Sequence, residues 1–518
     1  MSSKKIVDYI IVGGGAAGSA LAHRLGENPQ NQVLLIQADG PDELGHPMAS
    51  RLAQVPLGPQ FQDWQAPRTL GVRQVGHKST DGLAGGSTEA RRTIRSRRGE
   101  ADYDTWAAAG VSGWNLARFV EAFTAMEGYA AGATRLHGDD RPPAEAVVPL
   151  DATSELWIRT LARQGIASVE ELGEDRMQAG YTPQPVPTVV RTSTVRSLAH
   201  GYARRRNVRV RLHCTARRIL FDGVTASGVE AATPRGTVRF HARREVILCA
   251  GAVGNPLLLE RSGVGDSEVL TTAGVHLVAA NPAVGCNLRQ RRGAAITLWP
   301  SGVPEHDPEL VTPFARLRAR VGRALRRPGP PAQVDMSILA VLPSERGASR
   351  PDMELLFTPA PVMGATVAFL PQSCTSVGRI HISGPALEDP PRLVPGYLST
   401  AHDKELTVAA FARTREILAT EPFASAMTET FPGTDVADPA DVLRYVRENG
   451  FTEQAVGTCS LGSGGVVDDE LRVHGTHRLR VADASVMPTL TTGDTEAASM
   501  AVGWIAGDIL RNANTRSR

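Results

Sequence analysis

The chain has 518 residues, too many for one ordinary hydrophobic core, so at least two domains are expected. Its 56 Lys and Arg nearly balance 54 Asp and Glu, which gives no support for nucleic acid or a membrane surface as partner. The five cysteines lie far apart, without metal-ligand or disulfide spacing, no apolar stretch reaches membrane-spanning length, and the first strand leaves no room for a signal peptide. These features predict a cytoplasmic protein without a metal.

The first predicted unit is a strand, a glycine turn, a helix and a second strand at 33–36. Gly13 allows the tight turn, Gly15 lets a pyrophosphate approach the backbone, and Gly18 lets the helix pack close to the strand. The phosphates then bind free N–H groups where the helix begins, at Ala16. This unit predicts dinucleotide binding.

The end of the second strand departs from the usual pattern. An acidic residue normally bonds the adenosine ribose there, whereas this chain has Gln37, with Asp39 two residues later. An amide accepts from a ribose hydroxyl more weakly than a carboxylate does. No arginine stands beside Gln37, so a cofactor with a 2′-phosphate is not indicated.

Further elements are predicted along the chain by apolar periodicity and turn residues. The predicted helices lie near 101–106, 153–164 and 403–418, and the predicted strands at 208–212, 218–221, 245–249 and 378–382. The Arg- and Pro-rich stretch at 316–331 is typical of a solvated loop or helix rather than an anion-binding patch.

Five segments, in order along the chain, resemble the glucose–methanol–choline (GMC) family of FAD-dependent oxidoreductases. They are Ala84–Thr88 with Ala101–Trp106, Gly251–Gly265, Val284–Leu288, Val456–Cys459 and Val481–Thr489. The resemblance implies an α/β fold, with a Rossmann-like FAD-binding domain of the p-hydroxybenzoate hydroxylase type and an α+β substrate domain built on a mixed sheet. The expected FAD domain is discontinuous (1–145, 190–292 and 445–518), and the substrate domain takes 146–189 and 293–444.

The resemblance also assigns cofactor contacts. It implies a second flavin-facing turn, backbone contact on the adenosine side, contact with the ribityl chain, and a helix N-terminus at the pyrimidine end of the flavin. The second flavin-facing turn is assigned to Gly85, Gly86, Ser87 and Thr88, and the backbone contact on the adenosine side to Ala250 and Gly251. The contact with the ribityl chain is assigned to Asp483 and Ala484, and the helix N-terminus to Thr495. Capping or turn chemistry is the alternative for Ser87, Thr88 and Asp483.

The chain departs from the family at the positions of the active-site residues and of the covalent flavin link. Gln454 stands where the family has its active-site histidine, and Asp494 where it has Asn or His. Arg91 replaces the Asn of the first signature, and Ala90 occupies the position of a covalent flavin link, so the FAD is expected to be non-covalent. Arg91 either stabilises the reduced flavin or belongs to a solvated arginine run.

These departures change the expected proton chemistry. A positioned base contributes about 10²–10⁴ in rate, and Gln454 cannot titrate, although it can orient a hydroxyl. Asp494 is either the base or the partner of a cationic substrate group. Glu453 and Glu496 either share that cavity or are solvated or capping residues. His474 lies in a predicted turn before a strand, where a structural role is expected.

The predicted function is oxidation of a CH–OH group in a polar small molecule by hydride transfer to flavin N5, then to oxygen or another acceptor. An amino sugar or natural-product intermediate of bacterial secondary metabolism is the candidate substrate. The altered positions leave two alternatives open. One is non-standard flavin chemistry, as in a lyase, a cyclase or isomerase, or a photodecarboxylase. The other is a non-catalytic FAD-binding homologue.

Overall fold

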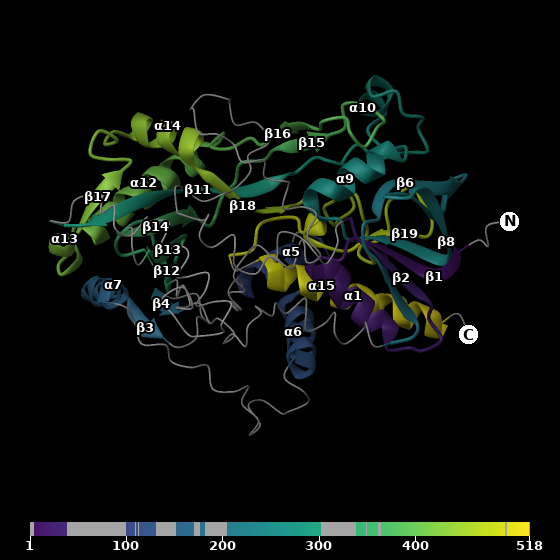
Figure 1. Ribbon diagram of the computed structural model, residues 1–518, viewed down its shortest axis with the longest axis horizontal. Coiled ribbons are helices and arrows are strands. Elements are labelled where there is room, and N and C mark those ends of the chain that lie inside the picture. The colour runs from purple at the N-terminus through teal and green to yellow at the C-terminus, as the bar shows by residue number, and fades with distance from the viewer. Residues whose placement is uncertain are drawn as a thin grey trace, which may run out of the picture.

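The computed structural model contains two large sheets with helices packed around them (Figure 1). The residues that it describes are 5–38, 100–108, 110–111, 113–130, 152–169, 177–181, 205–301, 338–348, 350–360, 364–492 and 495–516.

The first sheet has seven strands and contains the predicted strand–helix–strand unit. Its order is β5–β2–β1–β8–β7–β6, and β19 pairs with β8. Pairing is parallel among β5, β2, β1, β8 and β19, whereas β6, β7 and β8 form an antiparallel meander. The strands are β1 (Lys5–Val12), β2 (Val33–Ile36), β5 (Val208–Arg211), β6 (Thr215–Asp222), β7 (Thr225–Thr233), β8 (Gly236–Leu248) and β19 (Leu479–Val481).

Helix packing explains the continuous apolar run in β1. Its residues from Tyr9 to Val12 are all buried, as is typical of a central parallel strand whose two faces are covered. Helix α1 (Ala16–Gly26) links β1 to β2, and the long C-terminal helix α15 (Thr495–Arg516) lies against α1 (Figure 1). A Cβ added at Gly503 would lie 2.1 Å from the backbone oxygen of Ala17, so glycine is what allows this close approach.

The second sheet has eight strands and is mostly antiparallel. Its order is β17–β11–β14–β13–β12–β4–β3, with β18 paired to β11 and a parallel pair between β3 and β4. The strands are β3 (Ala167–Val169), β4 (Gln178–Tyr181), β11 (Arg289–Pro300), β12 (Ile338–Leu342), β13 (Met353–Ala360), β14 (Gly364–Pro371), β17 (Met427–Phe431) and β18 (Phe451–Val456).

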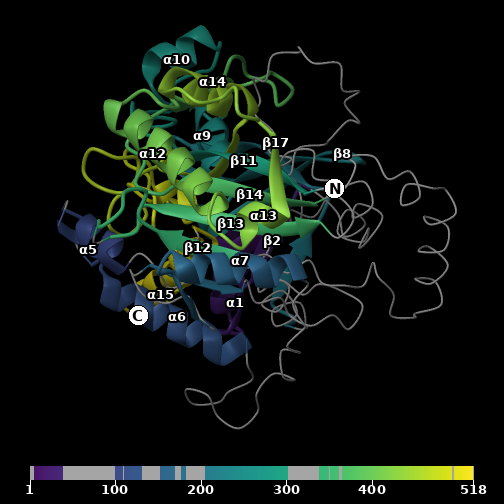
Figure 2. The same ribbon diagram turned by 90° about the vertical axis from the view of Figure 1, so that its left-hand side faces the viewer.

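Helices cover one face of this second sheet (Figure 2). Ala294, Ile296 and Leu298 of β11 point into the core under the helices, whereas Ala295 belongs to a smaller cluster on the other face, as the alternation of a strand requires. The stacking of Trp157 on Phe357, at 5.2 Å between ring centroids, anchors the first of these helices. The covering helices are α7 (Ala152–Arg163), α12 (Ala401–Leu418), α13 (Phe423–Ala426) and α14 (Pro439–Asn449).

Shorter elements complete the described chain. They are α5 (Glu100–Ala108), α6 (Leu116–Ala130), α9 (Gly251–Arg261), α10 (Ser267–Thr272), η4 (Ala484–Val486), and the two-stranded sheets β9 (Val264–Gly265) with β10 (Ala279–Ala280) and β15 (Arg379–His381) with β16 (Arg392–Val394).

The predicted elements are confirmed, with shifts at their ends. The helix expected from 403 begins at Ala401, because the Thr400 hydroxyl accepts from the Asp403 N–H and caps it. The strand expected at 245–249 is only the buried end of β8, whose earlier part alternates exposed and buried residues in the meander. None of the described helices is both long and apolar enough to cross a membrane.

The two-part fold is confirmed as a Rossmann-like sheet together with a mixed sheet in an α+β unit. Strands of the first sheet come from 5–36, 208–248 and 479–481, and those of the second from 167–181, 289–371 and 427–456. The domain boundaries given above stay predictions.

Candidate functional site

The glycine turn after β1 admits no side chain at its two tightest positions. Gly13 has φ +106°, and a Cβ there would lie 2.2 Å from the Cys249 backbone oxygen. A Cβ on Gly18 would lie 1.9 Å from the Gly13 oxygen. No side chain caps the N-terminus of α1 at Gly15, so its first N–H groups and positive dipole suit an anion. This turn fits the pyrophosphate of a dinucleotide.

Gln37 closes back onto this turn. Its side-chain oxygen accepts from the Gly14 N–H at 2.6 Å, and the residue is buried at the end of β2. The Gln37 amide therefore stabilises the turn. The same side chain is the one predicted to contact the ribose. The predicted ribose contact itself stays a prediction.

A second glycine turn follows β8. Gly251 has φ +82°, and a Cβ there would meet no atom of the described residues within 4 Å. No side chain caps α9 at Ala250. Two hydrogen bonds stabilise the turn. The Ala250 N–H donates to Asn255 Oδ1 at 2.8 Å, and the Gly251 N–H donates to Asp483 Oδ2 at 2.7 Å. The contact of this turn with the adenosine half of a cofactor stays a prediction.

Asp483 joins the start of α9 to the start of η4. Oδ2 accepts from Gly251 and from Asn255 Nδ2 at 2.7 Å, and Oδ1 accepts from the Ser485 N–H at 2.9 Å and its hydroxyl at 2.6 Å. Burial raises the pKa of this carboxyl, and these hydrogen bonds oppose that rise. The residue thus performs turn and capping chemistry at the start of η4, beside Ala484. Its contact with a ribityl chain stays a prediction.

Gln454 occupies an unusual backbone conformation. It lies in β18 with φ +59°, in the left-handed region that ordinary residues rarely adopt, and it is 8% exposed. The neighbouring Glu453 pairs with Arg291 of β11 along the backbone, although its side chain lies outside the described part. A buried outlier of this kind is typical of a functional position.

Arg291 connects this strand to the C-terminal segment. Its side chain is fully buried, one guanidinium nitrogen donates to the Thr491 oxygen, and another is 3.9 Å from Glu354 Oε2. Thr491 leads into α15, whose first residues Thr495 and Glu496 are also buried. Glu496 is therefore not a solvated residue, and its carboxylate lies at the positive end of a helix.

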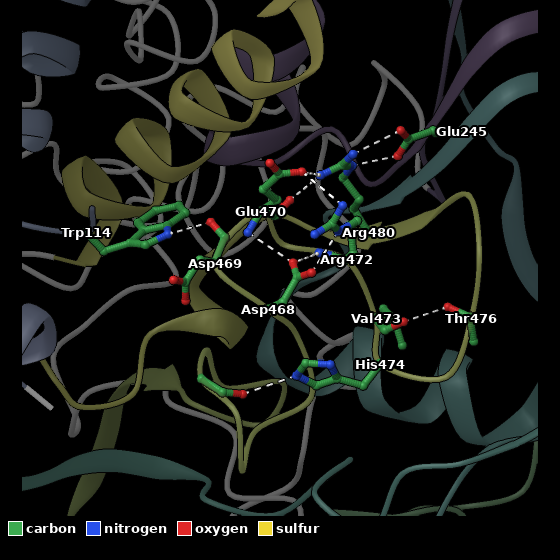
Figure 3. Close-up of polar contacts among 11 residues, drawn as sticks. Trp114, Glu245, Asp468, Asp469, Glu470, Arg472, Val473, His474, Thr476 and Arg480 are labelled. Carbon is green, nitrogen blue, oxygen red and sulfur yellow. Dashed lines mark hydrogen bonds and ion pairs between the residues drawn. The ribbon is translucent and has the colours of Figure 1, made fainter. Parts of the chain in front are cut away.

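The two histidines between the altered positions lie in the loop before β19, as the turn prediction implies, and Figure 3 shows the first of them, His474. His474 Nε2 is 3.2 Å from the Gly462 oxygen, and the exposed His477 donates its N–H to the Val224 oxygen at 3.0 Å. Arg480 in β19 forms a two-bonded ion pair with Glu245, at 2.6 and 3.1 Å, beside this loop (Figure 3).

Several predicted site residues lie outside the described residues. They are Gly85, Gly86, Ser87, Thr88, Arg91 and Asp494. Sequence reasoning missed Asn255, Ser485 and Arg291. The first two are polar residues inside segments already matched to the family, which was a usable signal. Arg291 gave none, because its burial depends on Thr491, two hundred residues away in sequence.

A sheet whose central strands β1 and β8 are parallel, each followed at its carboxyl end by a glycine turn, defines a dinucleotide-binding α/β protein. Models of the GMC oxidoreductase family match residues 7–292 and 374–503, so the chain belongs to that family. It is an FAD-dependent oxidoreductase, and the glycine turns described above fit that cofactor.

Individual relatives match over nearly the whole chain. Oxygen-dependent choline dehydrogenase 1 of Chromohalobacter salexigens is 29% identical, covering 99% of this chain and 96% of its own. An uncharacterized GMC-type oxidoreductase of Mycobacterium bovis is 30% identical, with 98% and 99% covered. The crystal structure of pyridoxine 4-oxidase from Mesorbium loti aligns with a TM-score of 0.76 at 26% identity, over 98% and 99% of the two chains.

Proposed function

We propose that this protein oxidises a CH–OH group of a polar small molecule, with an amino sugar or related natural-product intermediate as the substrate class. Bound FAD, held non-covalently, would supply the hydride acceptor. One observation carries the proposal: β18 presents a buried, strained Gln454, and Arg291 of the adjacent strand is bonded to the segment that leads into Thr495. The proposal assigns the two altered family positions, Gln454 and Asp494, to one site.

The residues of this region divide the chemistry between them. Gln454 cannot take a proton, so its amide orients the substrate hydroxyl. Asp494 is the proposed proton acceptor. We propose that the carboxyl group of Glu496, buried in the first turn of α15, contacts a cationic group of the substrate. The electron acceptor is oxygen or another oxidant, and the reducing interior of a bacterial cell is the proposed location, since all five cysteines are free.

Anaerobic mixing of the holoenzyme with a panel of alcohols, including amino sugars, tests this proposal through bleaching of the flavin absorbance. Asp494→Asn should slow bleaching by about 10²-fold or more if Asp494 is the base, and should mainly raise KM if it binds a cation. Gln454→His tests the other position, because histidine tolerates the left-handed conformation and adds a titratable group. We expect this variant to bleach faster. Bleaching by no alcohol at all would refute the proposal.

Arg291 favours a second candidate function. A buried guanidinium suits the substrate carboxylate that a light-driven decarboxylation would require, and Arg291 already lies 3.9 Å from the Glu354 carboxylate. In that case alcohols leave the flavin spectrum unchanged, whereas a carboxylic acid is consumed in the dark or only under blue light. Arg291→Lys would then weaken carboxylate binding while preserving the charge, because lysine lacks the forked geometry of the guanidinium.

A further inference from the structure

A pocket of about 520 Å³ lies at the far end of α15 from the predicted flavin contact at Thr495. Its walls come from Tyr9 of β1, from β8, from the 472–480 segment that ends in β19, and from the last turns of α15. Ala513, which lines it, lies about 27 Å from Thr495 along the helix, since each residue adds about 1.5 Å. The pocket is therefore separate from that contact.

The walls of this pocket are strongly basic. Among the described residues that line it, five are arginines and one is a glutamate, Glu245. Arg480 forms two bonds with this glutamate, at 2.6 and 3.1 Å, and so already neutralises it (Figure 3). Arg472 lies 2.7 Å from Asp468 Oδ2 and 3.2 Å from Glu470 Oε2. These ion pairs hold two of the arginines in place.

Two more arginines come from β8. Arg243 Nε lies 2.9 Å from Asp8 Oδ1. Arg244 donates to the Tyr9 hydroxyl at 3.2 Å, and its guanidinium carbon is 5.7 Å from the centre of the same ring. A phenol carries no charge at neutral pH, so the contact with Tyr9 orients this guanidinium without neutralising it.

Arg478 is the lining residue that most clearly points to a ligand. It is exposed, and its side chain makes no hydrogen bond or ion pair within the described part of the chain. It also has φ +58°, a left-handed conformation that is strained for arginine. The backbone is fixed there, because the Val246 N–H donates to the Arg478 oxygen at 2.9 Å and the His477 N–H donates to the Val224 oxygen at 3.0 Å. Asparagine or glycine would fit this backbone better, so the guanidinium itself indicates a function.

The size and lining of the pocket favour a phosphorylated small molecule. Ligand pockets occupy about 300–1,000 Å³, and this one lies within that range. A guanidinium fork matches two oxygens of a phosphate group. The Thr476 hydroxyl and the imidazole of the exposed His477 line the same pocket and suit a polar body such as a sugar. The near balance of charge over the whole chain gives no support for nucleic acid as the occupant.

We propose that this pocket is a binding site for a small molecule that carries a phosphate group, which Arg478 binds through its forked guanidinium. Arg244 adds positive charge from the β8 wall. The site does not depend on the proposed alcohol oxidation, because it shares no residue with the positions assigned to that reaction. A ligand bound here contacts β8, the segment before β19 and the end of α15 together, so it stabilises the folded protein by mass action.

The test titrates the FAD-loaded protein at a fixed ionic strength with inorganic phosphate, glucose 6-phosphate and glucose, followed by calorimetry. We expect glucose 6-phosphate to bind with a Kd of about 1 mM or below and to raise Tm, whereas glucose does neither. Tighter binding of glucose 6-phosphate than of inorganic phosphate would support recognition of a phosphate ester, and equal binding would support recognition of the phosphate group alone. Absence of binding by both phosphate probes would overturn the proposal, whether or not alcohols bleach the flavin.

Substitution of Arg478 assigns the binding to this pocket. Arg478→Asn should weaken phosphate binding by about tenfold or more, because a charge-assisted hydrogen bond is lost. The same variant should keep or raise the Tm of the ligand-free protein, since asparagine tolerates the left-handed conformation. Arg478→Lys keeps the charge without the fork and should weaken binding less. The control is Arg209→Gln, an exposed arginine of the edge strand β5, which should change nothing. Undiminished binding by folded Arg478→Asn would show an adventitious ion only, and the proposal would fail.

Discussion

Substitution of Asp483 can distinguish a structural role of its carboxylate from a role in binding the cofactor. Its carboxylate accepts four hydrogen bonds, two on each oxygen, from Gly251, Asn255 and Ser485. Asp483→Asn keeps the shape but turns one oxygen into an NH₂ group, which then faces two donors. The Ser485 hydroxyl can reverse its direction, so the smallest loss is one bond from a backbone N–H together with the charge that strengthened the others.

The expected cost follows from these contacts. A hydrogen bond to a charged acceptor contributes about 1.5–3 kcal/mol, and an unpaired buried donor costs about 1–3 kcal/mol. We therefore expect Asp483→Asn to lower the free energy of unfolding by about 3 kcal/mol, before any loss of cofactor contact. For a cooperative unit of 150–250 residues this lowers Tm by roughly 6–12 °C.

Thermal unfolding of the flavin-free protein, followed by circular dichroism, measures this effect without the cofactor. Asp222→Asn is the control, because Asp222 is exposed at the end of β6, and a surface change of this kind stays within about 0.5 kcal/mol. If flavin-free Asp483→Asn melts within about 1 °C of the wild type while its FAD dissociates more readily, the network reasoning is wrong and the carboxylate serves the cofactor.

Three further perturbations have expected outcomes. Gly13→Ala places a methyl group 2.2 Å from the Cys249 oxygen, so the protein should lose its flavin absorbance on desalting; a retained yellow protein would contradict the tight turn. Arg480→Gln leaves the Glu245 carboxylate without its ion pair and should cost about 2–3 kcal/mol in urea unfolding, much of it recovered when Glu245→Gln is added. For Asp403, burial raises the pKa, but hydrogen bonds from two neighbouring residues outweigh burial and hold the pKa below its usual value. Its stabilisation is therefore present above about pH 4 and lost as the pH falls further, so Asp403→Asn should reduce Tm at pH 7 and approach the wild type at acid pH.

Local chemistry explains what could be predicted from the sequence. Gly13 has φ +106°, and a Cβ on either Gly13 or Gly18 would lie under 3 Å from a backbone atom, so only glycine fits at these positions. The two glycines in the sequence therefore predict the dinucleotide turn. The helix of 401–418 was predicted from about residue 403 because its apolar periodicity is local. The FAD cofactor and the family followed from several such local segments in a fixed order.

Long-range pairing explains what could not be predicted. The burial of Arg291 depends on a carbonyl in the segment before α15, and the contact of His381 with Glu260 joins residues 121 positions apart. Gln454 was recognised as a substitution, but its left-handed backbone arises from the pairing of β18 with β11. The hydrophobic periodicity of a sequence does not predict long-range contacts of this kind.

The packing of α15 on α1 has a consequence for biosynthesis. The strand and turn at residues 5–18 leave the ribosome first, yet β8, β19 and α15, which support them, come from residues 236–248, 479–481 and 495–516. At about 5–20 residues per second, nearly five hundred residues require roughly 25–100 s of synthesis. The strand β8, which pairs with β1, emerges about halfway through that interval, whereas α1 lacks its partner α15 until the end. Capture of FAD is therefore expected to be among the last events, after the C-terminal helix has emerged and closed on the first one.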